Sequence, residues 1–141
     1  MSSKICGGKL MAYNLKVDFD DSLEGVIKTS KGNVDISFSG KTLGPYDYFL
    51  GGYCGCLHST FMGIAKKKKV SYGTVNYEVY GEKRDETPTT LKYLKTTITF
   101  TGVNEEDQSK ITKSMELAER YCSISVTISK VAEMDFEIIF N

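Results

Sequence analysis

The sequence has no excess of charge of either sign, with 18 lysines and arginines against 18 aspartates and glutamates. Proteins that bind nucleic acids or acidic membrane surfaces usually carry a clear basic surplus. The composition therefore predicts no nucleic-acid partner and no membrane partner. The one basic run, Lys66–Lys69, follows an apolar helical stretch and suits the negative end of a helix dipole, so we interpret it as a solvated helix terminus.

The sequence also lacks a hydrophobic run long enough to cross a bilayer. Its most apolar stretch, Phe49–Ala65, has 17 residues with His58 and Ser59 near the middle. A membrane span needs about 20 mostly apolar residues. The opening residues, MSSKICGGKL, contain no apolar segment of the length that a signal peptide requires. These absences predict a cytoplasmic protein.

Cysteine is scarce as well, because the 141 residues include only Cys6, Cys54, Cys56 and Cys122. Four cysteines are too few for a disulfide scaffold in a chain of this length. In a reducing compartment, a thiol pair is more often catalytic or redox-active than structural. The alternative is that these cysteines are buried and act as small hydrophobic residues.

Hydrophobic periodicity predicts one α+β domain over residues 12–141, preceded by a flexible leader at residues 1–11. Alternating or β-branched segments predict six strands, at Ala12–Phe19, Leu23–Thr29, Val34–Phe38, Thr74–Tyr80, Leu91–Thr101 and Met134–Phe140. Helical spacing predicts three helices, at Tyr46–Lys69, after Asn104, and within Ser123–Val131 behind a break near Tyr121–Cys122. Strands in runs between isolated helices indicate an α+β fold, β-β-β-α-β-β-α-(α)-β, rather than alternating βαβ units.

The helix Tyr46–Lys69 carries small residues in rows spaced by four, which are the ridges along which helices pack. One row is Gly51, Gly55, Ser59 and Gly63, and another is Gly52, Cys56 and Thr60. A third row, Ser114, Ala118 and Cys122, lies on the second long helix. If these rows face each other, Cys56 and Cys122 are brought together across 66 positions (122 − 56) of sequence.

The same helix is apolar on every side, and such a helix needs cover all round. One sheet covers only one side. We therefore predict an obligate, intertwined homodimer in which two chains sandwich their central helices between six-stranded sheets.

Three features of the sequence together resemble the OsmC/Ohr family of small thiol peroxidases. Pro45 stands just before the helix. Cys56 lies in the helix, eleven residues after Pro45, and Cys122 lies far downstream near the helix break. The segments Gly81–Pro88 and Glu119–Ser125 look most like a YhfA-type sub-branch. The resemblance covers nearly the whole chain after residue 12.

The resemblance implies an intertwined homodimer that reduces organic hydroperoxides without a cofactor. Cys56 would be the peroxidatic cysteine and Cys122 the resolving cysteine, joined in an intramolecular disulfide that an external dithiol reduces. The apolar neighbours Phe49, Tyr53 and Phe61 would line the substrate pocket. Their alternative interpretation is plain hydrophobic core.

The chain departs from the family pattern at the positions that activate the cysteine. Tyr46, followed by Asp47, stands where the peroxidases place a glutamate, and neither arginine lies in the N-terminal strands. Lys16 or Lys28 could replace the missing arginine by charge, although lysine lacks the planar bidentate fork. Ser123 replaces the usual proline after the second cysteine. The alternative function is therefore a non-peroxidatic ligand-binding or redox-sensing dimer.

The motif Cys54-x-Cys56-x-His58 suggests a metal site, but helix geometry opposes it. Positions i and i+2 lie roughly 200° apart around a helix and face opposite sides. Cys54 and Cys56 would not reach the same ion, and we predict no metal. His58 is then a hydrogen-bonded core or interface residue.

Overall fold

The structure is a computed structural model that describes residues 5–6, 9–10 and 12–141. The chain divides into two compact units, Met1–Phe49 and Leu50–Asn141. The predicted flexible leader, residues 1–11, lies largely outside the described residues. Within it, β1 (Ile5–Cys6) and β2 (Lys9–Leu10) form a short antiparallel pair.

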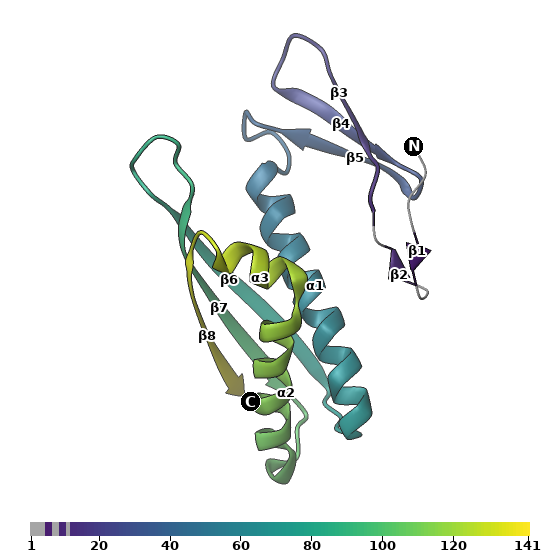
Figure 1. The fold of residues 1–141 in the computed structure, drawn as a ribbon, viewed down its shortest axis with the longest axis vertical. Helices are drawn as coiled ribbons and strands as arrows, with labels where there is room; N and C mark the ends of the chain where they lie inside the picture. Colours follow the sequence, from purple (N-terminus) through teal and green to yellow (C-terminus); the bar gives the residue numbers. More distant parts are fainter. Residues whose placement is uncertain (1–4, 7–8, 11) are drawn as a thin grey trace. The chain divides into compact units, whose positions relative to one another are not determined.

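The first unit contains the predicted three-stranded meander, built from β3 (Lys16–Phe19), β4 (Glu24–Thr29) and β5 (Gly32–Ser37). All pairings are antiparallel, in the order β3-β4-β5 (Figure 1). The first strand was expected to begin at residue 12, but β3 begins at Lys16, opposite Lys28. The chain leaves β4 one residue later for the turn at residues 30–31, so little of β4 remains to pair with residues 12–15. Gly32 has φ 138°, which favours glycine at the end of that turn.

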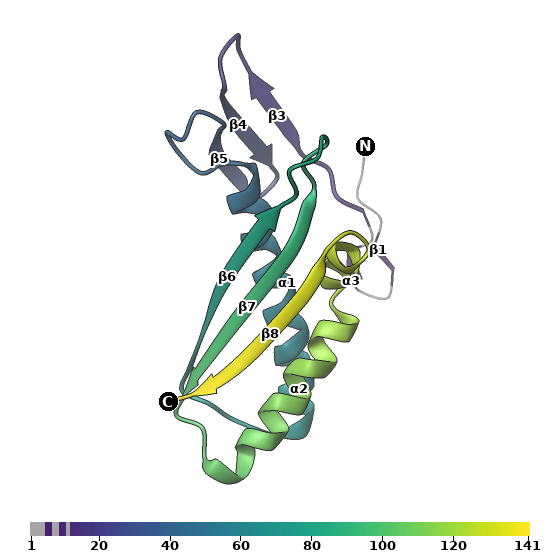
Figure 2. The same ribbon diagram turned by 90° about the vertical axis from the view of Figure 1, so that its left-hand side faces the viewer.

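The second unit is a three-stranded sheet in the order β6-β7-β8, with its helices on one face (Figure 2). The hairpin of β6 (Thr74–Lys83) and β7 (Leu91–Thr101) is antiparallel, as predicted. In contrast, β8 (Glu133–Phe140) pairs with β7 in parallel. Parallel neighbours need a crossover connection, so this part of the fold contains one β-α-β unit that the sequence pattern did not predict.

The helical crossover between β7 and β8 contains the predicted break. It consists of the 3-10 turn η1 (Glu105–Asp107), α2 (Gln108–Tyr121) and α3 (Ser123–Ser129). Cys122 stands between the two helices in an extended conformation, with φ −69° and ψ 118°. The predicted break at Tyr121–Cys122 is confirmed.

The six longer strands form two three-stranded sheets rather than one sheet of six. The 24-residue helix α1 (Pro45–Lys68) separates β5 from β6, so no short connection brings these strands side by side. The α+β fold class is confirmed. The six-stranded sheet is not formed within the described chain, and as part of a dimer it stays a prediction.

The hydrophobic core of the second unit lies between the sheet and the helices α1 and α2 (Figure 2). One stripe of α1 enters it through Tyr53, Leu57, Phe61 and Ala65. The other members are Leu91, Leu94, Ile98, Phe100, Ile111, Met115, Ala118, Cys122 and Ile128. Among the described helices, none is both long and apolar enough to cross a membrane.

The row of α1 that contains Cys56 meets the small-residue row of α2 at Cys122, whereas the row Gly51, Gly55, Ser59 and Gly63 does not pack against α2. A Cβ atom added at Gly51, Gly55 or Gly63 would meet nothing within 4 Å. The helix turns its large apolar stripe inward, and this places the glycine row on an open side. Each glycine costs about 1 kcal/mol against alanine in a helix, and no contact within the described chain offsets that cost.

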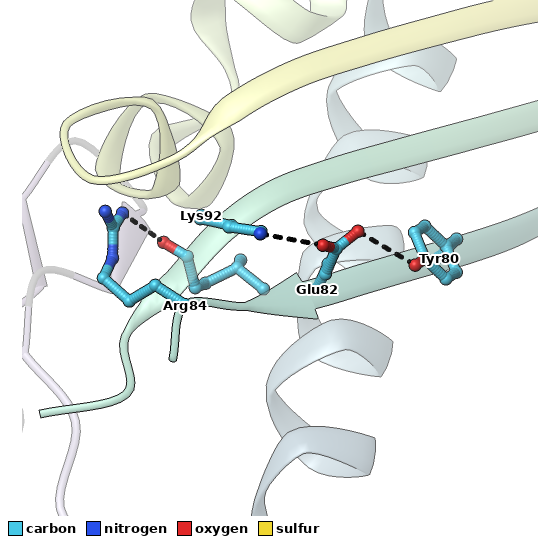
Figure 3. Close-up of polar contacts among 5 residues, drawn as sticks. Tyr80, Glu82, Arg84 and Lys92 are labelled. Atoms are coloured by element: carbon cyan, nitrogen blue, oxygen red, sulfur yellow. Dashed lines mark hydrogen bonds and ion pairs between the residues drawn. The ribbon is translucent and has the colours of Figure 1, made fainter. Parts of the chain in front are cut away.

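The arginine of the β6–β7 connection is engaged in backbone hydrogen bonds. Arg84 Nη2 donates to the carbonyl oxygens of Leu91, at 3.1 Å, and Val131, at 2.9 Å. Figure 3 shows Arg84 and, beside it, the exposed side chains of Lys92 and Tyr80, both of which contact Glu82. Arg84 thus ties the hairpin to the α3–β8 connection.

Candidate active site

Two thiols from distant parts of the chain meet at the helix break. The Cys122 thiol donates a hydrogen bond to Cys56 Sγ across 3.0 Å. Cys56 comes from the interior of α1 and is half-buried, whereas Cys122 is fully buried. Cys54, Cys56 and Cys122 are free thiols. The predicted juxtaposition of Cys56 and Cys122 is confirmed, while their catalytic roles stay predictions.

Cys122 also caps the short helix that follows it. Its sulfur accepts a hydrogen bond from the backbone N–H of Ser125 at 3.4 Å, and its own N–H donates to the Ala118 carbonyl at 2.7 Å. A side-chain acceptor at this position satisfies one of the free N–H groups at a helix start. The break between α2 and α3 therefore holds the Cys122 sulfur in one place, against Cys56.

Ser123 is the second side chain in contact with Cys56. Its hydroxyl oxygen lies 3.9 Å from Cys56 Sγ. The backbone N–H groups of Ile124 and Ser123 also act on this sulfur and lower its pKa. Neutral hydrogen-bond donors therefore surround the half-buried thiol on the side of the helix break.

The surroundings give the two thiols opposite character. Burial raises the pKa of Cys56, but hydrogen bonds from the Cys122 thiol, the Ile124 N–H and the Ser123 hydroxyl outweigh it and hold the pKa below that of an ordinary thiol. Burial, together with the hydrogen bond it donates to Cys56, raises the pKa of Cys122 to about 11. Cys56 is thus the thiol that ionises first, and Cys122 stays protonated beside it.

The predicted supporting residues lie in the first unit. Asp47, in the first turn of α1, accepts a hydrogen bond from the Gly44 N–H at 2.8 Å, and the Tyr46 ring contacts Phe49 edge-on. Lys16 and Lys28 are paired neighbours on β3 and β4. The Lys28 ammonium forms an exposed ion pair with Asp18. A role for these residues at Cys56 stays a prediction.

The three aromatic residues expected to line a substrate pocket have different surroundings. Tyr53 and Phe61 expose 1% and 0% of their surface and belong to the core. The Tyr53 hydroxyl is hydrogen-bonded to Thr96 Oγ1 at 3.0 Å. Phe49 is 40% exposed in the first unit. Within one chain, Tyr53 and Phe61 are core residues, as the alternative interpretation predicted. A role for them in a substrate pocket stays a prediction.

His58 and Cys54 lie away from the thiol pair. His58 Nδ1 is 3.0 Å from the Tyr77 hydroxyl, and the two rings meet edge-on. Burial raises the pKa of the Cys54 thiol. Over the part of the chain that the structure describes, no three His, Cys, Asp or Glu side chains are grouped to hold a metal ion.

Two features of this region were not predicted from the sequence. Ser123 was noted only as a departure from a family pattern, and its only local signal is its place beside Cys122. Glu119, near the end of α2, is half-buried, and burial together with the carboxylates of Asp135 and Glu116 raises its pKa to about 6. Neither the contact nor the burial can be recognised from spacing, because both depend on which elements pack together.

The sequence and the fold were compared with known proteins. The family model described as OsmC-like protein matches residues 38–137. No curated protein matches the chain. Similar solved structures include an OsmC-like protein from Mycoplasma pneumoniae, which is 14% identical, covers 92% of this chain and 96% of that chain, and has a TM-score of 0.80.

Two further solved structures share the fold. A hypothetical protein from Aquifex aeolicus VF5 is 18% identical over 92% of this chain and 98% of that chain, with a TM-score of 0.75. The organic hydroperoxide resistance protein OhrB of Bacillus subtilis is 21% identical over 89% of this chain and 98% of that chain, with a TM-score of 0.63. At these identities the structures support the fold alone, and the YhfA-type sub-branch stays a prediction.

The matched segment, residues 38–137, includes both Cys56 and Cys122 and most of the described chain. The element order, the α+β architecture and the meeting of the two thiols agree with the resemblance noted in the sequence. The chain belongs to the OsmC-like protein family.

Proposed function

We propose that this protein is a thiol-dependent reductase of organic hydroperoxides, with Cys56 as the peroxidatic and Cys122 as the resolving cysteine. The observation that carries the proposal is the 3.0 Å contact between the two sulfur atoms. It joins a thiol whose pKa is lowered to one whose pKa is raised to about 11. The first half of the reaction needs a nucleophile, which Cys56 supplies, and the second half needs a protonated thiol, which Cys122 supplies.

In the first half, the Cys56 thiolate attacks the terminal oxygen of the hydroperoxide. The O–O bond breaks, Cys56 becomes a sulfenic acid, and the alkoxide takes a proton and leaves as the alcohol. In the second half, the Cys122 sulfur attacks the sulfenic sulfur. A disulfide forms, and the sulfenic hydroxyl leaves with the Cys122 proton as water.

The resting enzyme is restored by an external dithiol. Its thiolate exchanges with the Cys56–Cys122 disulfide, and its second thiol completes the exchange, which leaves the reductant oxidised and both cysteines as thiols. A disulfide bond is about 2.05 Å long, so sulfurs 3.0 Å apart need only a small movement to bond. We place this cycle in the cytoplasm, where dithiol reductants operate.

The apolar setting supports an organic substrate rather than hydrogen peroxide. Cys56 packs against the hydrophobic core, and Cys122 is one of its members. Transfer of the alkyl part of an organic hydroperoxide from water to such a surface lowers the free energy of binding. Hydrogen peroxide has no apolar part and lacks this contribution. Tyr46, Asp47, Lys16 and Lys28 are the candidates for a polar supporting role in place of the family's glutamate and arginine.

The proposal is tested by titrating free thiols before and after one equivalent of cumene hydroperoxide. We expect the wild-type chain to lose two thiols rapidly, and peptide mapping to find a Cys56–Cys122 disulfide. Cys54 should remain free, since it lies on another side of α1. Slow loss, or loss of thiols other than this pair, would favour the non-peroxidatic alternative of a ligand-binding or redox-sensing protein.

We further propose that the active form is the intertwined homodimer. The open glycine row of α1 supports it, because no contact in the described part of the chain requires glycine at positions 51, 55 or 63. Large apolar side chains are also exposed, among them Met62 on α1 at 42%. A second copy of the helix packed on this row would explain both features.

The homodimer predicts a species of twice the 15.7 kDa chain mass in sedimentation. Gly63→Leu should convert it to the monomer, because the leucine has free space within one chain but would block close approach of a second helix. The substitution also improves helix propensity, so circular dichroism should show an intact fold. A wild-type monomer, or a Gly63→Leu variant that remains dimeric, would contradict the proposed interface.

A further inference from the structure

Within the second unit, the groups that act on the Cys56 thiol are all uncharged. They are the Cys122 thiol, the Ser123 hydroxyl and two backbone N–H groups. Only two of them are side chains, and one of these, Cys122, is consumed as a reactant when it attacks the sulfenic acid. The Ser123 hydroxyl is therefore the one side-chain donor that is present throughout the cycle.

The backbone at this position does not require serine. Ser123 is the first residue of α3, a position that favours proline. Cys122, at φ −69° and ψ 118°, already has the extended conformation that a following proline imposes. Serine contributes nothing to the turn that proline would not contribute, but it adds a hydroxyl and an N–H beside Cys56 Sγ.

The Ser123 hydroxyl makes no other hydrogen bond among the described contacts except the one to Cys56 Sγ, at 3.9 Å. It is therefore free to rotate its O–H toward the sulfur. A hydrogen bond to the charged form of a group favours that form. Ser129, on the same helix, is different, because its hydroxyl donates to the Val126 carbonyl.

We propose that Ser123 is a positioning residue that stabilises the Cys56 thiolate through its hydroxyl group. The proposal rests on the proposed function, for which the thiolate is the attacking species. Its chemistry is simple: the hydroxyl keeps its proton, donates a hydrogen bond, and lowers the free energy of the ionised sulfur relative to the thiol.

The test measures the pH dependence of Cys56 alkylation by iodoacetamide in the full chain, with the modified peptide quantified by mass spectrometry. Ser123→Ala should move the midpoint to higher pH and slow alkylation about threefold below the midpoint, as loss of one hydrogen bond to a thiolate implies. Ser123→Pro should shift it at least as far, because it also removes the N–H. Ser123→Thr keeps the hydroxyl and should restore the wild-type profile.

Ser129→Ala is the matched control and should leave the Cys56 profile unchanged. An unchanged midpoint in Ser123→Ala would overturn the proposal, and so would an equal shift in Ser123→Thr, because packing rather than the hydroxyl would then be responsible. The alkylation assay uses no peroxide. A shifted midpoint in a chain that reduces no hydroperoxide would therefore support the role of Ser123 while contradicting the proposed function.

Discussion

Cys56→Ser is expected to lower hydroperoxide turnover by more than about a thousandfold, as removal of the nucleophile does in other covalent catalysts. A serine hydroxyl is not appreciably ionised at neutral pH and cannot be oxidised to the equivalent of a sulfenic acid. The Cys122 thiol is a poor substitute, because burial raises its pKa and keeps it protonated even when Cys56 is absent. Turnover is measured by following cumene hydroperoxide consumption with a dithiol as reductant.

Cys54→Ser is the matched control for this experiment. Cys54 lies two residues away on the same helix, and burial raises the pKa of its thiol. It has no hydrogen bond to the Cys56–Cys122 pair among the described contacts. Activity should stay within about twofold of wild type, because the substitution replaces one atom of a half-buried side chain away from the reacting groups. Equal losses in both variants would show that the helix, rather than the Cys56 nucleophile, had been damaged.

Cys122→Ser is expected to change the product of the first turnover from a disulfide to a sulfenic acid on Cys56. The hydroperoxide is still cleaved, because Cys56 remains, but no other described thiol is hydrogen-bonded to Cys56 to release water and close the disulfide. The sulfenic acid should then react with dimedone, and excess hydroperoxide should carry it on to the sulfinic acid. Mass spectrometry of the Cys56 peptide distinguishes these products.

The serine variant is suited to this test because serine is a strong helix N-cap. It can take over the hydrogen bond from the Ser125 N–H that Cys122 now accepts. The fold should therefore be retained, and circular dichroism provides the check. If the wild-type chain also accumulates a dimedone-reactive sulfenic acid, or if Cys122→Ser still forms an intramolecular disulfide, then Cys122 is not the resolving residue.

The opposite pKa shifts of the two thiols determine how the cycle depends on pH. Because the pKa of Cys56 is lowered, its thiolate is populated at a pH where an ordinary cysteine is still protonated. Cys122 keeps its proton across the same range, so it can supply the proton with which water leaves. The rate of the first half of the cycle therefore rises with pH only until the Cys56 thiol is ionised.

Several parts of this protein could be predicted from the sequence because they depend on local chemistry. The break near Tyr121–Cys122, the β6–β7 hairpin and the meander all follow from periodicity and turn residues close to one another in the chain. The pairing of Cys56 with Cys122 was predicted from small residues at helical spacing, although the glycine row offered in support of it faces open space. The family resemblance depended on the same residues.

Other features depended on packing between distant segments, which local pattern does not encode. The length of β3 depends on where its partner β4 ends in a turn. The parallel pairing of β8 with β7 depends on the helical crossover formed by α2 and α3. The lowered pKa of Cys56 depends on donors 66 and more residues away. The sequence alone thus determined the order of the helices and strands and which two thiols meet. Only the tertiary structure decided what surrounds each sulfur, because the ionisation of a thiol depends on its burial and on the donors that the fold brings to it.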